Sequence, residues 1–222
     1  MNLLAFELST EHCSVALLVD GELQQLAEKG NRPSRRILAM ADELLAEAGL
    51  RATEMDAIAF GRGPGAFTGL RIAAGVAQGL AFGAELPVVP VSSLAALAQR
   101  AAEDRDAAQI VAVLDARMNE IYSGSFRLAA NGLVQAAGDE QLLPPAALEI
   151  PADGEWIGAG PGWAAYPALA NKLPAVFPEI VPDAAAIARL AAVAFASDGG
   201  VDAAHAMPVY LRDTVAWKKT AE

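Results

Sequence analysis

The sequence predicts an α/β protein built from two related lobes. Apolar segments with the character of strands alternate with helical patterns up to about residue 105. A second strand followed by a hairpin then begins at residue 109, in the way the chain itself begins. We therefore expect one lobe over residues 1–105 and a second over 106–205, with a tail of about 206–222 packing back on the first lobe.

The first lobe opens with a predicted three-stranded meander over residues 2–10 and 13–30. Asp20 and Gly21 stand between two apolar runs, the strongest local hairpin signal in the chain. Residues 34–48 change to helical spacing, with apolar residues at i, i+4, i+7 and i+11, and Gly49 follows as the expected C-cap.

Two further strand–helix pairs complete this lobe. Residues 55–60 predict a buried strand that runs into a glycine-rich loop, followed by a helix over 68–82. Residues 87–91 predict another buried strand, and 92–104 a helix with Ser92 or Ser93 at its N-cap.

The second lobe begins with a predicted strand over residues 109–117. Residues 120–137 predict a hairpin that turns at Asn131 and Gly132. A proline-rich stretch, the strand-like segment EWIGAG and a helix over 183–196 follow.

Composition and charge limit the classes of function. The formal net charge is −11, which repels polyphosphate, so we expect any nucleic acid to be held only through partners that supply positive charge. Cys13 is the single cysteine, which suits the cytosol. The first residues lack the features of a signal peptide, and no stretch is suited to span a membrane. We therefore expect a cytoplasmic protein that does not bind a membrane. His12 and His205 are the only histidines, with no His-x-x-x-His or Cys-x-x-Cys pattern, so we expect no metal.

The loop GRGPGAFTGLRIAAG, residues 61–75, has two interpretations. It matches neither the Walker loop nor the dinucleotide fingerprint, although a strand-to-helix turn rich in N–H groups can receive an anion. The interpretation we favour is a tight turn that needs positive φ at glycine. The candidate residues for binding a cofactor are Ser9, Thr10, Gly63 and Gly65. Ser9 and Thr10 belong to the turn ELST, which could resemble the phosphate turn of sugar kinases and actin-like ATPases. We nevertheless expect that the chain binds no cofactor and has no catalytic residue.

One charged cluster stays open between two interpretations. Asp115, Arg117 and Glu120 gather at a predicted strand end. They could form a solvated ion pair worth about 0–1 kcal/mol, which we favour, or line a cleft.

The helix over 68–82 is apolar nearly all round, which is unusual for a surface helix. Gly75 and Gly79 lie on one face, where missing side chains let another backbone approach. We infer that part of this helix, together with the helix over 34–48, faces another protein. The expected interface residues are Ile37, Ala41, Leu44, Leu45, Arg71, Ala74, Gly75, Gln78, Gly79 and Phe82.

Around the segment GRGPGAFTGLRIAAGVAQGLA stand five further segments, STEHCSVALL and MDAIAF before it and LPVVPVSSL, LDARMNEIY and PVYLRDTVAWKK after it. The first segment is similar to the hallmark of the TsaB family, the small subunit of the bacterial machinery that makes threonylcarbamoyladenosine on tRNA, and the other five fall in the order expected of that family. The resemblance implies a two-lobed actin/Hsp70/hexokinase-like fold (ASKHA, ribonuclease H-like). It also implies a non-catalytic subunit that binds and activates TsaD, which transfers threonylcarbamoyl to N6 of adenosine 37 in tRNAs reading ANN codons, and that works with TsaE or forms a homodimer when alone.

Two departures from the family and two alternatives belong beside this expectation. The first turn has Glu7-Leu8 in place of the usual Asp-Thr, and Pro33-Ser34 stands where many relatives have His-Ser. The metal-binding His-x-x-x-His of TsaD-like relatives is replaced by VSSLAAL. The alternatives are an enzyme, either an ASKHA-type ATP-dependent kinase or an M22-like glycopeptidase, and a homodimeric binding module for an unrelated partner.

Overall fold

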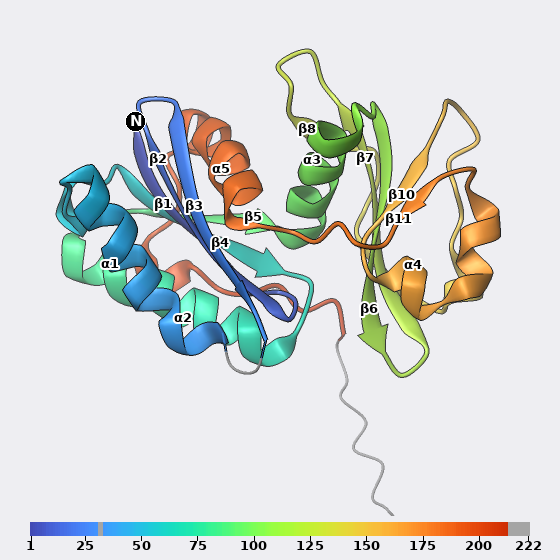
Figure 1. Ribbon diagram of the computed structural model, residues 1–222, viewed down its shortest axis with the longest axis horizontal. Helices are drawn as coiled ribbons and strands as arrows, with labels where there is room; N and C mark the ends of the chain where they lie inside the picture. Colours follow the sequence, from blue (N-terminus) through green and yellow to red (C-terminus); the bar gives the residue numbers. More distant parts are fainter. Residues whose placement is uncertain (31–32, 213–222) are drawn as a thin grey trace, which may run out of the picture.

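Two β-sheets stand side by side in the computed structural model, which describes residues 1–30 and 33–212 (Figure 1). We name them sheet A and sheet B. Sheet A has the strand order β3-β2-β1-β4-β5. Its strands are β1 (Asn2–Glu7), β2 (His12–Val19), β3 (Glu22–Lys29), β4 (Ala57–Gly63) and β5 (Val88–Ser92).

Sheet A follows from the predicted meander and the two buried strands. β1 pairs antiparallel with β2 and parallel with β4, which in turn pairs parallel with β5. The hairpin at Asp20 and Gly21 is confirmed, with φ of 49° and 93°, the positive values that a tight primed turn requires.

Sheet B repeats this pattern. Its order is β11-β10-β6-β7-β8, in which β6 pairs antiparallel with β7 and parallel with β10. The predicted turn near Asn131 and Gly132 is confirmed, since the Gly132 N–H donates to the Ala129 carbonyl at 2.9 Å. The strands are β6 (Gln109–Arg117), β7 (Glu120–Leu128), β8 (Val134–Ala136), β9 (Gln141–Leu143), β10 (Ile157–Ala159) and β11 (Val176–Phe177).

The caps predicted at Gly49 and Ser92 are confirmed, whereas the first helix begins at Ile37, three residues later than predicted, and α4 was not predicted. Gly49 ends the first helix with φ of 68°, and Ser92 caps α3 by accepting the Ala95 N–H at 3.1 Å. Asp183 caps α5 in the same way through the Ala186 N–H at 2.9 Å. The α-helices are α1 (Ile37–Ala48), α2 (Phe67–Ala84), α3 (Ser93–Arg105), α4 (Gly162–Ala165) and α5 (Ala184–Asp198).

The helices divide between the sheets differently from the strands. α1 and α2 cover one face of sheet A and α5 covers the other, whereas α3 packs chiefly on sheet B (Figure 1). A boundary near residue 105 separates the strands of the two sheets, and we keep 1–105 and 106–205 as a proposal on that basis. The membership of two helices is corrected: α3 leaves the first lobe for sheet B, and α5 returns from the second lobe to sheet A, because each buries its apolar stripe there.

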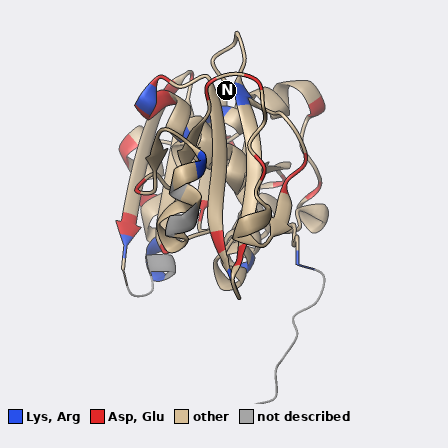
Figure 2. Ribbon diagram, turned by 90° about the vertical axis from the view of Figure 1, so that its right-hand side faces the viewer, with Lys and Arg blue, Asp and Glu red and all other residues tan. Residues whose placement is uncertain are grey.

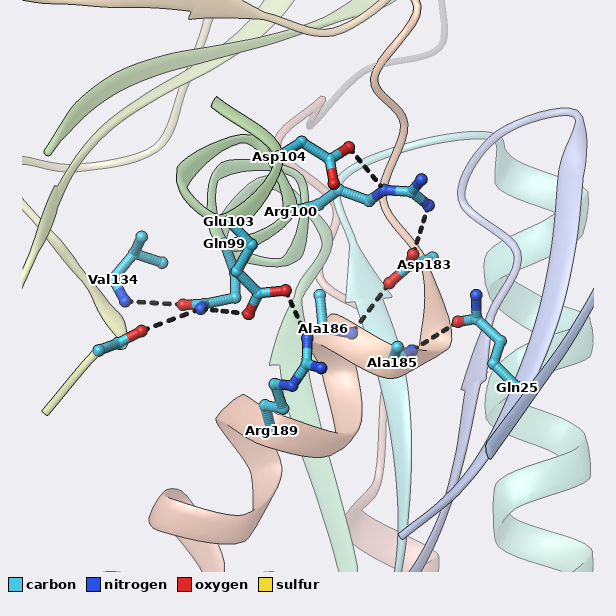
Figure 3. A network of polar contacts seen from close by, with 11 residues as sticks. Gln25, Gln99, Arg100, Glu103, Asp104, Val134, Asp183, Ala185, Ala186 and Arg189 are labelled. Carbon is cyan, nitrogen blue, oxygen red and sulfur yellow. Dashed lines mark hydrogen bonds and ion pairs between the residues drawn. The ribbon is translucent and has the colours of Figure 1, made fainter. Parts of the chain in front are cut away.

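A polar network ties α3 to α5 and so joins the lobes (Figure 3). Arg100 on α3 contacts Asp183 at 2.5 Å, and Arg189 on α5 pairs with Glu103. Gln99 accepts the Val134 N–H of sheet B at 2.9 Å, while Gln25 of sheet A accepts the Ala185 N–H at 2.8 Å. The two helices therefore form a hydrogen-bonded connection between the sheets.

Charged residues lie largely on loops and at the ends of elements, and few lie in the middle of the sheets (Figure 2). Glu7 and Asp183 are the buried acids among the described residues. Within residues 1–30 and 33–212, no helix has the length and apolarity that crossing a membrane requires.

Candidate partner-binding surface

Helix α2 is held to its own lobe by one face of small and branched apolar side chains. Leu70, Ala73, Ala77 and Ala81 are buried against the core beside β4. Gly69 lets the start of the helix approach the preceding turn, because a Cβ there would lie 1.9 Å from the Leu8 carbonyl oxygen. This buried stripe therefore fixes which face of α2 points outward.

The outward face of α2 is open in the single chain. A Cβ added at Gly75, Gly79 or Gly83 would meet nothing within 4 Å, and the three glycines repeat every four residues along one side. Phe82, next to this row, has 83% of its surface exposed. Sequence reasoning included Gly75, Gly79 and Phe82 and missed Gly83, although the same four-residue spacing points to it. We call Arg71, Gly75, Gly79, Phe82 and Gly83 the α2 surface.

The structure corrects the expected surface at five other residues. Each has at most 7% of its surface exposed and belongs to the core of sheet A. The apolar repeat of α1 is the stripe that faces its own sheet, as is usual for a helix packed on a lobe. A partner cannot reach these side chains on the folded chain, so we remove them from the surface. They are Ile37, Ala41, Leu44, Leu45 and Ala74.

The segment from residue 206 to 212 borders the α2 surface. The Gln78 amide, which we expected at the interface, is half-buried and donates to the Ala206 carbonyl at 3.2 Å. Arg71 donates from Nε to the Tyr210 hydroxyl at 3.2 Å, and its guanidinium lies 3.8 Å above the Phe67 ring. The rings of Phe67 and Tyr210 are 5.4 Å apart. Sequence reasoning missed Phe67 and Tyr210, which no local pattern connects.

The same segment reaches the second lobe. The Val209 N–H donates to the Arg62 carbonyl at 2.8 Å, and Arg212 contacts Glu120 at 2.7 Å. The expected tail therefore touches both lobes over 206–212. The remainder of the tail, and with it the end of the motif PVYLRDTVAWKK, lies outside the described residues.

The cluster of Asp115, Arg117 and Glu120 forms a braced turn between β6 and β7. Asp115 pairs with Arg117 at 3.0 Å and accepts the Tyr166 hydroxyl at 3.1 Å. Arg117, Met118 and Asn119 have φ of 62°, 54° and 59°, a run of left-handed residues that costs backbone energy. The Arg117 side chain is 87% exposed, which agrees with the solvated ion pair.

The four cofactor candidates lie around the tight turn before α2. Gly63 has φ of 99°, as the turn interpretation predicts, and a Cβ on Gly65 would lie 2.5 Å from the Ser9 Cβ. The Ser9 carbonyl accepts the Ala66 N–H at 2.7 Å, and Thr10 Oγ1 accepts the His12 N–H at 3.2 Å. These contacts brace the loop, and a role in binding a cofactor stays a hypothesis.

Glu7, the last residue of β1, lies beside this turn. Its carboxyl accepts the Ser9 N–H at 2.5 Å and the Ser93 hydroxyl at 2.9 Å. Burial raises the pKa of Glu7, and the hydrogen bonds from Ser9 and Ser93 oppose that shift. A carboxyl whose neutral form is favoured in this way is poorly suited to hold a magnesium ion. In the described part of the chain, no group of three or more His, Cys, Asp and Glu could hold a metal ion, and the expectation of no metal stays a prediction.

Two sheets of one repeated topology, with a glycine-lined helix left open on the first, define a two-lobed α/β protein of the actin/Hsp70/hexokinase-like (ASKHA) class. The family model for TsaD, the tRNA N6-adenosine threonylcarbamoyltransferase, matches residues 28–219. The chain is 41% identical to the tRNA threonylcarbamoyladenosine biosynthesis protein TsaB of Haemophilus influenzae, covering 99% of this chain and 97% of that one. It is 40% identical to TsaB of Escherichia coli, over 99% and 98% of the two chains.

A solved structure agrees with these relatives. YeaZ from Pseudomonas aeruginosa matches with a TM-score of 0.88 and 46% identity, over 95% of this chain and 99% of that one. The chain belongs to the TsaB family of tRNA threonylcarbamoyladenosine biosynthesis proteins, a family related to TsaD.

Proposed function

We propose that this chain is a non-catalytic scaffold subunit that binds and activates TsaD in the transfer of threonylcarbamoyl to N6 of adenosine 37 in tRNAs reading ANN codons. In this proposal it also helps to recruit TsaE, forms a homodimer when TsaD is absent, and contacts tRNA only through the complex. It acts in the cytoplasm. The relatives' names support the pathway, and the α2 surface supports the mode of action.

The open row of glycines is the observation that carries the proposal. Gly75, Gly79 and Gly83 offer a partner helix a close approach without side-chain obstruction, so the backbones of two helices can pack at short distance. Phe82 and Phe67, with 83% and 50% of their surfaces exposed, supply large apolar area beside this row. A helical partner is therefore the occupant that the surface favours.

The two alternative functions, a kinase and a glycopeptidase, require groups that bind phosphate or a metal ion, and the described residues support these less well. A kinase of this fold needs charged groups that hold phosphate and magnesium, whereas Glu7 is buried and hydrogen-bonded within the turn. A metal-dependent glycopeptidase needs a cluster of ligands. Calorimetry of the isolated protein with ATP and magnesium distinguishes the scaffold from an enzyme. Tight binding of ATP with turnover would show that the chain is an enzyme and would contradict the proposal.

The direct test places a long charged side chain on the row of glycines. We expect Gly75→Arg and Gly79→Arg to fold, because both positions face open space, and to weaken the complex with TsaD by about tenfold or more, as substitutions at the centre of an interface do. The measurement is size-exclusion chromatography with TsaD, together with tRNA modification in a reconstituted system.

The matched control is Ala196→Arg. It adds the same side chain at an exposed position of α5, on the opposite face of sheet A from α2. The control should bind TsaD as the unaltered chain does. A folded Gly79→Arg protein that elutes with TsaD as tightly as Ala196→Arg would overturn the proposal.

A further inference from the structure

Arg71 stands at the head of the glycine row on α2. Positions four apart on a helix share a side, and those along this side are Arg71, Gly75, Gly79 and Gly83. Of these, only Arg71 has a side chain, and it is exposed. A partner helix that packs along the three glycines therefore meets a guanidinium at the end where α2 begins.

The Arg71 side chain is held in place by neutral groups. Its Nε donates to the Tyr210 hydroxyl at 3.2 Å, and its guanidinium carbon lies 3.8 Å from the centre of the Phe67 ring. These contacts orient the guanidinium without neutralising its charge. Over residues 1–30 and 33–212, Arg71 forms no ion pair with an acid, and its two Nη groups donate no hydrogen bond.

Arg127 on β7 shows the same arrangement with a carboxylate added. Its guanidinium carbon lies 5.0 Å from the centre of the Trp156 ring, and its Nη2 pairs with Asp153 at 2.7 Å. Arg105 likewise combines an aromatic ring with an acid. Arg71 has the aromatic ring of such a site but lacks, within the described part of this acidic chain, the carboxylate that a guanidinium binds best.

We propose that Arg71 binds an Asp or Glu side chain on the helix of the partner that packs along Gly75 and Gly79. The inference rests on the proposed function, since it states what the partner of that same surface carries. Tyr210 is a positioning residue, because it holds Nε and leaves the Nη groups of the guanidinium for the partner. A basic residue at the same place in the partner would be repelled, so the contact selects between partners.

The partner that supplies this carboxylate is a different protein rather than a second copy of the chain. Residues 67–84, which form α2, contain no acid. Two α2 helices packed together would therefore bring two Arg71 guanidinium groups to the interface and no carboxylate from either helix. The charge of Arg71 thus favours the complex with TsaD over a homodimer through the same helices.

The first test compares Arg71→Gln and Arg71→Glu with the same two changes at Arg127. Arg127 is a matched control because it also stacks on an aromatic ring but lies on sheet B. The measurement is titration calorimetry with TsaD. We expect Arg71→Gln to raise Kd about tenfold and Arg71→Glu to raise it further, because a negative charge then faces the partner's acid. The Arg127 variants should stay within about twofold of the unaltered chain.

The salt dependence of binding tests the charge directly. Between about 50 mM and about 500 mM sodium chloride, the Kd of the unaltered chain for TsaD should rise more steeply than that of Arg71→Gln, because salt screens an ion pair that the variant lacks. Equal slopes for the two proteins would contradict the ion pair.

Tyr210→Phe tests the positioning role, since it keeps the ring beside Phe67 and removes only the hydroxyl. It should raise the Kd for TsaD about threefold in the unaltered chain and leave it unchanged in the Arg71→Gln background. A hydroxyl that only supported the fold would change the Kd equally in both backgrounds, which would contradict this role.

The outcomes separate this inference from the proposed function. If Arg71→Gln binds TsaD as tightly as Arg127→Gln while Gly79→Arg does not bind, the inference is overturned and the proposed function stands. A folded Gly79→Arg protein that binds TsaD normally refutes both. Arg71→Gln should keep the Tm of the isolated chain within about 2 °C of the unaltered value. A larger fall would show that the guanidinium serves the chain's own fold, and would overturn the inference.

Discussion

Asp183 offers the sharpest test of how the two lobes are joined. Its carboxylate accepts the Ala186 N–H as the N-cap of α5 and contacts Arg100 of α3 at 2.5 Å (Figure 3). The Asp183 side chain is 11% exposed, whereas Arg100 is 38% exposed and pairs also with Asp104 at 3.3 Å. The Asp183 side chain thus caps α5, which packs on sheet A, and also contacts α3, which packs on sheet B.

The expected cost of Asp183→Ala follows from these two roles. Loss of an N-cap costs about 0.5–2 kcal/mol of unfolding free energy. A hydrogen bond to a charged group is worth about 1.5–3 kcal/mol, and the lower end applies because Arg100 stays partly solvated and keeps Asp104. We expect a total near 2–3 kcal/mol, which corresponds to a fall in Tm of about 4–12 °C in a chain of this size.

Urea unfolding of three variants measures this. Asp183→Asn keeps an oxygen for the cap and loses the charge, so it should lose less stability than Asp183→Ala. Asp104→Ala removes the exposed partner of the same arginine and should cost about 0.3–0.5 kcal/mol. If the unfolding free energies of Asp183→Ala and Asp104→Ala lie within about 0.5 kcal/mol of each other, the contact between α3 and α5 does not contribute as argued.

Two further predictions concern buried titratable groups. Burial raises the pKa of Glu7, so its contribution to stability is present at low pH and is lost as the pH rises through the raised value. In urea unfolding, the stability of Glu7→Gln relative to the unaltered chain should therefore increase between about pH 4 and about pH 8. A stability difference between the two proteins that does not change with pH would contradict this. Burial also raises the pKa of the Cys13 thiol to about 11. Iodoacetamide at about pH 8 should leave the folded chain unmodified and alkylate it in urea, as mass spectrometry can show; rapid alkylation of the folded chain would refute the burial of Cys13.

Local chemistry made much of the fold predictable. Asp20-Gly21, Gly49 and Ser92 mark a hairpin, a helix end and a helix start, and each acts through its own backbone conformation or side chain within three residues. The glycine spacing of α2 was also visible, because residues four apart on a helix share a face wherever that helix lies.

Contacts between distant residues could not be predicted in this way. Arg100 and Asp183 are 83 residues apart, and Arg71 and Tyr210 are 139 apart, so no sequence pattern indicates that they meet. For the same reason the sequence did not show that α3 packs on sheet B and α5 on sheet A. The apolar stripe of α5 predicts that it is buried, but it carries no information about which of two similar sheets buries it.

The same limit explains why half of the expected interface lay in the core. Ile37, Leu44 and Leu45 are large apolar side chains, and large apolar side chains on a helix are first used to cover the helix's own sheet. A face left over for a partner must expose little apolar area while the chain is alone, and glycine achieves this because it has no side chain to expose. On α2 the three open glycines meet this condition, and Phe67 and Phe82 are the exposed large apolar side chains beside them. A partner that covers them gains backbone-to-backbone packing that the isolated chain cannot supply, and for that reason one arginine on this row should weaken association while leaving the fold intact.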